Sequence, residues 1–211
     1  MARGLFVTFE GGDGSGKTTV IHELEKRLDK LQISYLHTRE PGGSVIAEEI
    51  RNIILDRKNT AMDKRTEALL YAASRRQHLV EIVFPALKEG KIVLCDRYLD
   101  SSLAYQGYAR KIGMDEVYSI NLFATENTLP DLTFFLDLPP KEGLLRIAKN
   151  KEREVNRLDL EKENFHQAVY EGYQLLLKRY PERIKRIDAR KSVDEEVEEI
   201  EKILLPRIKQ G

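Results

Sequence analysis

Cysteine and net charge are both scarce in this chain of 211 residues, and each scarcity excludes a class of protein. A single cysteine excludes an internal disulfide, and because Cys95 ends the apolar run 92–95 we expect a small buried side chain. Lys plus Arg and Asp plus Glu each number 35, so the net charge is zero. No overall field therefore favours a polyanion, and we expect no nucleic-acid partner and only local phosphate binding.

Long apolar runs are also missing. No segment approaches the ~20 consecutive apolar residues that cross a bilayer. Met1 is followed by a strand-like segment instead of the basic and apolar regions of a signal peptide. These patterns predict a soluble cytoplasmic protein without a membrane partner.

What the sequence does have is a regular alternation of short β-branched runs and longer segments of helical period. This pattern is typical of an α/β fold with a parallel sheet flanked by helices. Helices are expected to begin near residues 17, 44, 63, 100, 114, 141, 159 and 192. Five strands are predicted, over residues 5–9, 34–37, 92–95, 132–136 and 183–187. The length fits one domain over 1–211, in which Pro85 should kink or divide the helical stretch 63–89.

One segment matches the phosphate-binding pattern G-x-x-x-x-G-K-[ST] directly after the first predicted strand and before a helix. Its glycines let backbone N–H groups converge on a phosphate, and the helix N-terminus adds partial positive charge. Lys17 can reach the β- and γ-phosphates, and the Thr18 hydroxyl can complete the shell of a bridging Mg²⁺. The predicted ATP site consists of Gly11, Gly12, Asp13, Gly14, Ser15, Gly16, Lys17, Thr18 and Thr19. A glycine-rich turn without a ligand is the alternative.

A nucleotide-binding loop does not say what is done with the nucleotide. A small-molecule kinase, a GTPase switch and an ATPase or binding module are all compatible with it. A guanine-reading switch needs an Asn-Lys-x-Asp element, whereas the nearest string, at residues 150–153, is Asn-Lys-Glu-Arg. The short chain disfavours a motor-like ATPase, so the pattern favours a small-molecule kinase.

Three further runs follow in order: Thr-Arg-Glu-Pro-Gly-Gly at 38–43, Cys-Asp-Arg-Tyr at 95–98 and Ser-Ser-Leu-Ala-Tyr-Gln-Gly at 101–107. With the phosphate-binding loop they resemble bacterial thymidylate kinase from about residue 5 to residue 110, and the similarity resumes at 130–132 and 156–159. The resemblance implies a P-loop nucleoside-monophosphate kinase fold with a short lid, and a homodimer. It also implies transfer of the ATP γ-phosphoryl to dTMP, which serves dTTP synthesis for DNA replication. A kinase for another nucleoside monophosphate and a non-enzymatic nucleotide-binding module are the alternatives.

Charged residues near the strand ends suggest how phosphates are handled. Asp96 follows the third predicted strand at its carboxyl end, where its carboxylate can hold the hydration shell of Mg²⁺ opposite Thr18. Arg97 beside it can fork onto a phosphate, and the resemblance assigns it to the transferred group. The resemblance likewise assigns Arg39 and Arg51 to the acceptor phosphate. For Arg51, an exposed helix charge is the alternative.

Two pairs of residues four apart predict a base-binding surface. Tyr71 and Arg75 share a helix face, so they can offer a ring that stacks on a base and a guanidinium that donates to its carbonyl. Ser102 and Gln106 place a hydroxyl and a carboxamide on one side of another helix, and a carboxamide matches the adjacent N–H and C=O of thymine. A core tyrosine and a solvated polar face are the alternatives.

The sugar of the acceptor is addressed by the resemblance alone. It places Tyr105 beneath the sugar, where the ring crowds a ribose 2′-OH and favours deoxynucleotides. It assigns Asp13 to accept a hydrogen bond from the acceptor 3′-OH. Many relatives have Phe where Tyr71 stands, a change that keeps the stacking ring and adds a hydroxyl.

The predicted reaction needs cations more than it needs a base. An ionised phosphate acceptor requires no general base, so we assign that role to none of the four histidines. Lys17, Arg97 and Mg²⁺ supply part of the positive charge around the migrating group. Some thymidylate kinases carry an arginine inside the phosphate-binding loop, whereas this chain has none there. The resemblance to the bacterial type therefore implies that a basic lid at about 149–157 supplies the catalytic residues Arg153 and Arg157. A solvated charge cluster is the alternative.

Overall fold

A parallel sheet of five strands lies at the centre of the computed structural model, which describes residues 3–149 and 157–208. The strand order is β2-β3-β1-β4-β5, and every pairing is parallel. The strands are β1 (Phe6–Glu10), β2 (Tyr35–Arg39), β3 (Ile92–Asp96), β4 (Leu132–Asp137) and β5 (Ile184–Asp188). All five predicted strands are therefore confirmed, with ends that differ by no more than two residues.

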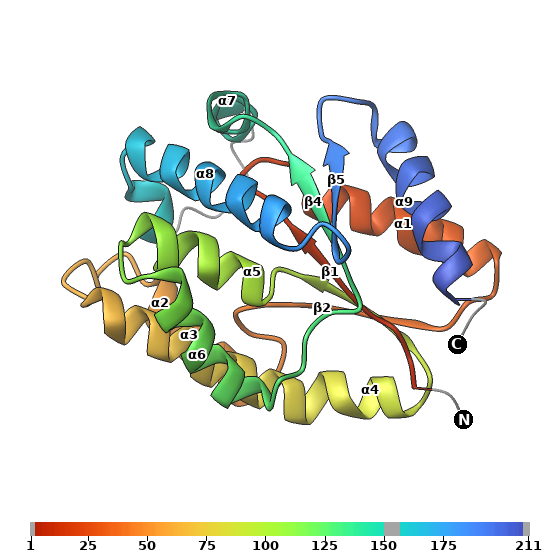
Figure 1. The fold of residues 1–211 in the computed structure, drawn as a ribbon, viewed down its shortest axis with the longest axis horizontal. Helices are drawn as coiled ribbons and strands as arrows, with labels where there is room; N and C mark the ends of the chain where they lie inside the picture. Colours follow the sequence, from red (N-terminus) through yellow and green to blue (C-terminus); the bar gives the residue numbers. More distant parts are fainter. Residues whose placement is uncertain (1–2, 150–156, 209–211) are drawn as a thin grey trace.

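Helices cover both faces of this sheet, as Figure 1 shows. Helices α1 and α9 lie on one side, and α3, α5, α6 and α8 lie on the other. The α-helices are α1 (Lys17–Lys30), α2 (Val45–Leu55), α3 (Lys64–His78), α4 (Phe84–Lys88), α5 (Leu99–Ser102), α6 (Met114–Thr125), α7 (Pro140–Lys149), α8 (Glu163–Arg179) and α9 (Val193–Ile208). Two π-helical segments, η1 (Leu79–Val83) and η2 (Leu103–Ala109), and a 3₁₀ turn, η3 (Arg157–Leu160), complete the described elements. None of the helices in the described ranges has the length and apolar character needed to cross a membrane.

The core forms two clusters because side chains alternate between the faces of each strand. Phe6 and Phe135 face the helices of the α3 side, whereas Val7 and Phe134 face α1 and α9. Cys95 lies fully buried in the first cluster, as predicted, and burial raises the pKa of its thiol well above the ordinary value.

Two helix boundaries show how local chemistry shapes the chain. The stretch predicted over 63–89 is divided into α3, η1 and α4, since Pro85 has no N–H to donate and its ring disturbs the preceding turn. The helix expected near residue 159 begins only at Glu163, so that boundary was wrong. The Glu161 amide instead donates to the Leu158 carbonyl and closes the short turn η3 before α8 starts.

The carboxyl ends of three neighbouring strands meet at one edge of the sheet. Asp96, at the end of β3, is in register with Phe9 of β1 on one side and with Arg39 of β2 on the other. Open α/β sheets bind ligands at this edge. The fold therefore brings the phosphate-binding loop, Asp96, Arg97 and Arg39 to one place.

Candidate active site

A cavity of about 890 Å³ opens at this edge of the sheet, a size suited to small-molecule ligands. Its lining comes from the phosphate-binding loop, from β2 and β3, from α2, α3 and η2, and from α7 and the start of α9. The cavity thus touches the predicted donor site and the predicted acceptor site at once.

The phosphate-binding loop has the backbone that its glycines predict. Gly14 and Gly16 have φ values of 77° and 92°, a left-handed region that disfavours other residues. A Cβ on Gly14 would also lie 2.3 Å from the carbonyl oxygen of Gly143, so the close approach of α7 requires glycine there. The loop is therefore shaped for a phosphate before any ligand arrives.

Lys17 begins α1 and lies folded over this loop. Its Nζ donates to the carbonyls of Gly11 at 3.1 Å and Gly12 at 3.3 Å. Burial, and then the charge of Arg97, lower the pKa of Lys17 to about 8. The ammonium is held by neutral oxygens, the two carbonyls and the Ser15 hydroxyl at 3.5 Å, and a phosphate oxygen can replace these partners.

Thr18 and Asp96 face one another, as the metal prediction requires. The Thr18 hydroxyl donates to Asp96 Oδ2 at 3.4 Å. Asp96 Oδ1 is buried, yet among the described residues it accepts no hydrogen bond. A buried carboxylate oxygen without a partner is costly unless a cation or its water shell satisfies it. The hydroxyl and carboxylate are oxygen donors of the kind that Mg²⁺ prefers, so these residues fit the predicted ion.

Arg97 lies over the loop between two other predicted site residues. Its guanidinium donates to Asp13 Oδ1 at 2.8 Å and to the Gly11 carbonyl at 3.0 Å, and it lies 5.2 Å from the centre of the Tyr105 ring. The Tyr105 hydroxyl also donates to Asp13, at 3.3 Å. Arg97 has a φ of 67°, which is strained for a residue with a side chain and is typical of functional positions.

Glu10 holds the strained turn that carries Arg97. Its buried carboxylate accepts hydrogen bonds from the Tyr98 amide at 2.8 Å, the Ser101 hydroxyl at 2.6 Å and the Tyr173 hydroxyl at 2.8 Å. Burial, followed by repulsion from Asp100, raises its pKa to about 7. Sequence reasoning missed this anchoring role, and its one signal was a carboxylate at the end of a buried strand whose other residues are all uncharged.

Two predicted acceptor-phosphate arginines converge on one carbonyl. The Nη1 atoms of Arg39 and Arg51 donate to the Pro41 carbonyl at 3.0 Å and 2.9 Å, and both side chains line the cavity. Arg39 also pairs with Glu48, at 3.1 Å. Two guanidinium groups brought to one point make a site for an anion with several oxygens.

The predicted base-binding residues divide between the cavity wall and the layer behind it. Tyr71, Tyr105 and Gln106 line the cavity. Arg75 and Ser102 do not line the cavity but lie buried behind that wall, where the Arg75 Nη1 donates to the Ser102 hydroxyl at 3.1 Å. The contact of all five residues with a base stays a prediction.

Buried oxygen acceptors explain why Arg75 lies so deep. Its Nε donates to Glu40 at 2.7 Å, its Nη2 donates to the Tyr98 carbonyl at 2.9 Å, and its Nη1 also contacts Asn121. Glu40 is as buried as Arg75, so the two charges satisfy each other inside the protein.

Glu67 on α3 is a buried carboxylate that sequence reasoning missed. It accepts hydrogen bonds from Gln106 Nε2 at 2.9 Å, Arg157 Nη2 at 2.6 Å and Arg110 Nη2 at 3.2 Å. Burial works to raise its pKa, but the Gln106 hydrogen bond and the charges of Arg110 and Arg157 outweigh it, so the pKa is lowered. The signal was its position four residues before Tyr71 on one helix face.

Of the two predicted lid arginines, only Arg157 lies within the described residues. Arg157 is buried, with its Nε donating to the Ile54 carbonyl at 2.8 Å and its Nη2 paired with Glu67. Its neighbour Leu158 lines the cavity. Arg153 lies outside the described residues, as does the lid segment 150–156.

The far end of the cavity, next to α7 and α9, was not predicted. Arg146, Lys191 and Glu196 line it. The Glu196 carboxylate is nearly buried, burial raises its pKa to about 7, and its Oε2 has no hydrogen-bond partner among the described residues. A capping box precedes α9, because the Ser192 amide donates to Glu195 at 2.9 Å.

Comparison with known proteins agrees with this geometry. The family model described as thymidylate kinase matches residues 9–200. The thymidylate kinase of Clostridium novyi is 60% identical over 204 residues, which cover 97% of this chain and all of that protein. The thymidylate kinase of Oceanobacillus iheyensis is 62% identical over 191 residues, covering 90% of this chain and 85% of the relative. A crystal structure of thymidylate kinase from Ehrlichia chaffeensis, 32% identical, has a TM-score of 0.77 and covers 96% of this chain and 99% of its own, which confirms the predicted fold class.

Proposed function

The chain belongs to the thymidylate kinase family, and we propose that it transfers the γ-phosphoryl group of ATP to dTMP, giving dTDP and ADP. One observation carries the proposal: two phosphate-binding groups open into the same cavity. One is the glycine-rich loop with Lys17, and the other is the pair Arg39 and Arg51. Arg97 lies beside the loop, where it can meet the phosphoryl group that passes between them.

On the donor side, the loop amides and Lys17 would hold the ATP phosphates. Thr18 and Asp96 would hold Mg²⁺, which supplies positive charge to the β- and γ-phosphate oxygens when bound. The base of ATP would lie at the far end of the cavity between α7 and the start of α9. There the Glu196 Oε2, which has no hydrogen-bond partner in the described ranges 3–149 and 157–208, offers an acceptor for an exocyclic amino group.

On the acceptor side, the Tyr71 ring would stack on thymine and Gln106 would read its edge. Arg75 and Ser102 would contact the base after a small inward shift, because they lie directly behind this wall. Tyr105 would crowd a 2′-OH and so favour the deoxy sugar.

Glu67 gives Gln106 its polarity. A carboxylate only accepts hydrogen bonds, so Gln106 must turn its amide nitrogen toward Glu67 and its oxygen away from it. The Gln106 oxygen is then available to accept the thymine N–H. Glu67 is in this sense a positioning residue for base selection.

Phosphoryl transfer follows from positioning and charge. Arg97 would exchange its contact with Asp13 for the migrating phosphoryl group, and this would release the Asp13 carboxylate to accept the 3′-OH of dTMP. The acceptor phosphate is already ionised, so no side chain has to remove a proton. Arg153 and Arg157 would add the remaining positive charge when the segment about 149–157 closes.

The direct test measures ADP formation with dTMP, dUMP, dCMP, GMP and AMP in turn. We expect the highest kcat/KM with dTMP. Preference for another acceptor would replace the substrate assignment, and tight nucleotide binding without turnover would contradict the kinase assignment. The expected compartment is the cytoplasm, where ATP and DNA precursors are made.

We also propose that residues 1–211 form one domain that assembles as a homodimer. Large apolar side chains are exposed on neighbouring elements, with Leu69 on α3, Val80 on η1 and Phe123 on α6, the last 91% exposed. Light scattering should give twice the chain mass of 24.4 kDa. Phe123→Glu should shift the protein toward monomer, and a monomeric wild type would refute the dimer.

A further inference from the structure

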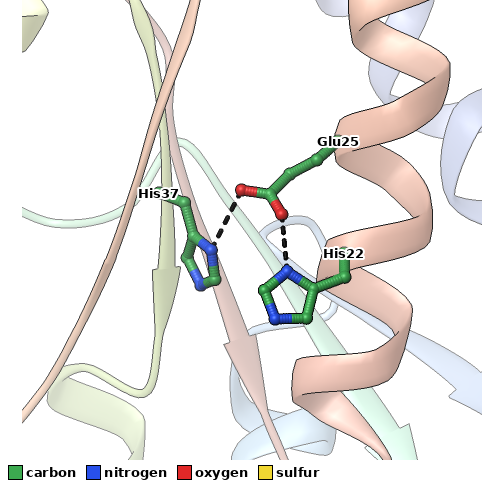
Figure 2. A group of neighbouring side chains, drawn as sticks. All are labelled: His22, Glu25 and His37. Atoms are coloured by element: carbon green, nitrogen blue, oxygen red, sulfur yellow. Dashed lines mark hydrogen bonds and ion pairs between the residues drawn. The ribbon is translucent and has the colours of Figure 1, made fainter.

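Three side chains with metal-binding atoms meet at a place whose residues do not line the cavity. Figure 2 shows them: His22 and Glu25 from α1 and His37 from β2. The His22 Nδ1 lies 2.7 Å from Glu25 Oε2, and the His37 Nδ1 lies 3.0 Å from Glu25 Oε1. The three ligand atoms all lie within 4.8 Å of one another. We propose that the His22–Glu25–His37 cluster binds one divalent ion of the first transition series, and Zn²⁺ is the ion used to test this.

The donor set selects the class of ion. Two imidazoles and one carboxylate, with a position left for water, form a set that Zn²⁺ and its neighbours in the first transition series bind well. Mg²⁺ prefers oxygen ligands and keeps its waters, so it is suited to Thr18 and Asp96 and unsuited to this cluster. The two sites therefore discriminate by chemistry.

The geometry needs only a small adjustment. With bonds of about 2.0–2.2 Å and tetrahedral angles, ligand atoms around Zn²⁺ lie about 3.3–3.5 Å apart. The observed separations of 2.7 Å and 3.0 Å are shorter because the carboxylate now accepts a hydrogen bond from the His22 ring and lies at ion-pair distance from the His37 ring. Withdrawal of Glu25 by roughly half an ångström opens the space for an ion.

Protons balance without another reactant. Each neutral imidazole must present an unprotonated Nδ1 to the ion, so its proton moves to Nε2 through a change of tautomer in water. If a ring is protonated beforehand, its extra proton is released to solvent on binding. The Glu25 carboxylate loses its hydrogen bond with the His22 ring and its close contact with the His37 ring, and it gains the cation.

The scaffold holds the ligands in place before binding. His22 and Glu25 are three residues apart on one helix face. The His22 ring and the Glu25 carboxylate meet the ring of His37, which lies on a strand fixed by its pairing with β3. The Glu25 and His37 side chains are 17% and 24% exposed, and His22 is 58% exposed, so an ion can enter without opening the core. The entropy cost of assembling the site is therefore low.

A metal ion at this cluster would link α1 and β2, two elements that carry predicted nucleotide-site residues. His22 lies one helical turn beyond Thr18 on α1, and His37 lies two residues before Arg39 on β2. The bound ion would stabilise both elements without contacting the phosphates. The inference rests on these three residues and does not depend on the proposed kinase activity.

The test uses untagged full-length protein that has been treated with a chelator and dialysed. Calorimetric titration with Zn²⁺ should give one site per chain, and Zn²⁺ should raise Tm. Co²⁺ in place of Zn²⁺ should give the strong visible absorption of a low-coordinate site. His22→Gln, Glu25→Gln and His37→Gln should each weaken binding by at least the ~10–100-fold that follows loss of a residue that merely supports a ligand.

The matched control is Glu23→Gln, which removes an acid of the same helix that lies outside the cluster. It should bind Zn²⁺ as the wild type does. Equal binding by all of these variants, or no Zn²⁺ uptake by the wild type, would overturn the proposal. Because His22 is mostly exposed, its variant should keep the wild-type far-ultraviolet spectrum and so report on the metal alone.

Discussion

Replacement of Glu67 by glutamine should reveal what the buried carboxylate does. Glu67 is 1% exposed and neutralises Arg157, whose side chain is 6% exposed, whereas Arg110 keeps a second partner in Glu161 at 2.6 Å. Loss of one member of a buried ion pair costs about 3–5 kcal/mol. For a chain of this size that corresponds to a fall in Tm of roughly 6–20 °C.

The more specific effect is on base selection. The amide of Glu67→Gln can donate as well as accept, so Gln106 can present either end to the base. Thymine offers an N–H beside a carbonyl, whereas cytosine offers an acceptor nitrogen beside an amino group. One misdirected hydrogen bond is worth about 1–2 kcal/mol, so the preference for dTMP over dCMP in kcat/KM should fall by about 10-fold.

The assay compares both acceptors at saturating ATP, below the Tm of the variant. KM for ATP should change little, since Glu67 lies on the acceptor side of the cavity. Glu161→Gln is the control, because it removes a charge from Arg110 and leaves Glu67 and Gln106 intact. If Glu67→Gln loses stability but keeps the wild-type ratio of dTMP to dCMP, Glu67 supports the fold and does not set selectivity.

Three further predictions address the cations and the strained turn. Asp96→Asn should raise the Mg²⁺ concentration needed for half-maximal rate, because the buried oxygen loses its charge; an unchanged Mg²⁺ titration would place the ion elsewhere. Arg157→Ala should lower kcat by about 10²-fold or more, as for other arginines of phosphoryl transfer, and an unchanged kcat would refute its catalytic role. Glu10 has a pKa raised from 4.5 to about 7, so its protonation contributes about 3 kcal/mol of stability that is present below pH 4.5 and is lost as the pH rises through 7. Denaturant titrations of wild type and Glu10→Gln at several pH values should show that this fall disappears in the variant, and parallel curves would contradict it.

The strands and the phosphate-binding loop could be predicted because each depends on neighbouring residues. A run such as residues 92–95 is apolar on both faces only if both faces are buried, which identifies a central strand. Gly14 and Gly16 are needed by a local backbone conformation, so their spacing carries the structure with it. For these features, sequence and structure hold the same information.

The buried polar contacts could not be predicted in the same way. Glu67 meets Gln106 and Arg157 across 39 and 90 residues of sequence, and only the folded chain brings them together. For Arg75 the helical period gave the face but not the depth, which is set by Glu40, 35 residues away. His22 and His37 likewise read as surface or polar-packing residues until α1 and β2 are placed side by side.

The cations around the cavity all have protein oxygens as partners, which explains how a protein with zero net charge can bind two polyanions. Lys17 is held by loop carbonyls, Arg97 by Asp13, and Arg157 by Glu67. Arg39 is held by Glu48 and the Pro41 carbonyl, and Arg51 also donates to that carbonyl. Before a nucleotide binds, each of these cations has a protein oxygen as its partner. On binding, each can exchange that oxygen for a phosphate oxygen. Exchange from a neutral carbonyl gains a charge-assisted bond, whereas exchange from a carboxylate gains less. The phosphates should therefore be captured first by Lys17, and the carboxylate-bound Arg39, Arg97 and Arg157 should move last, when both substrates are in place.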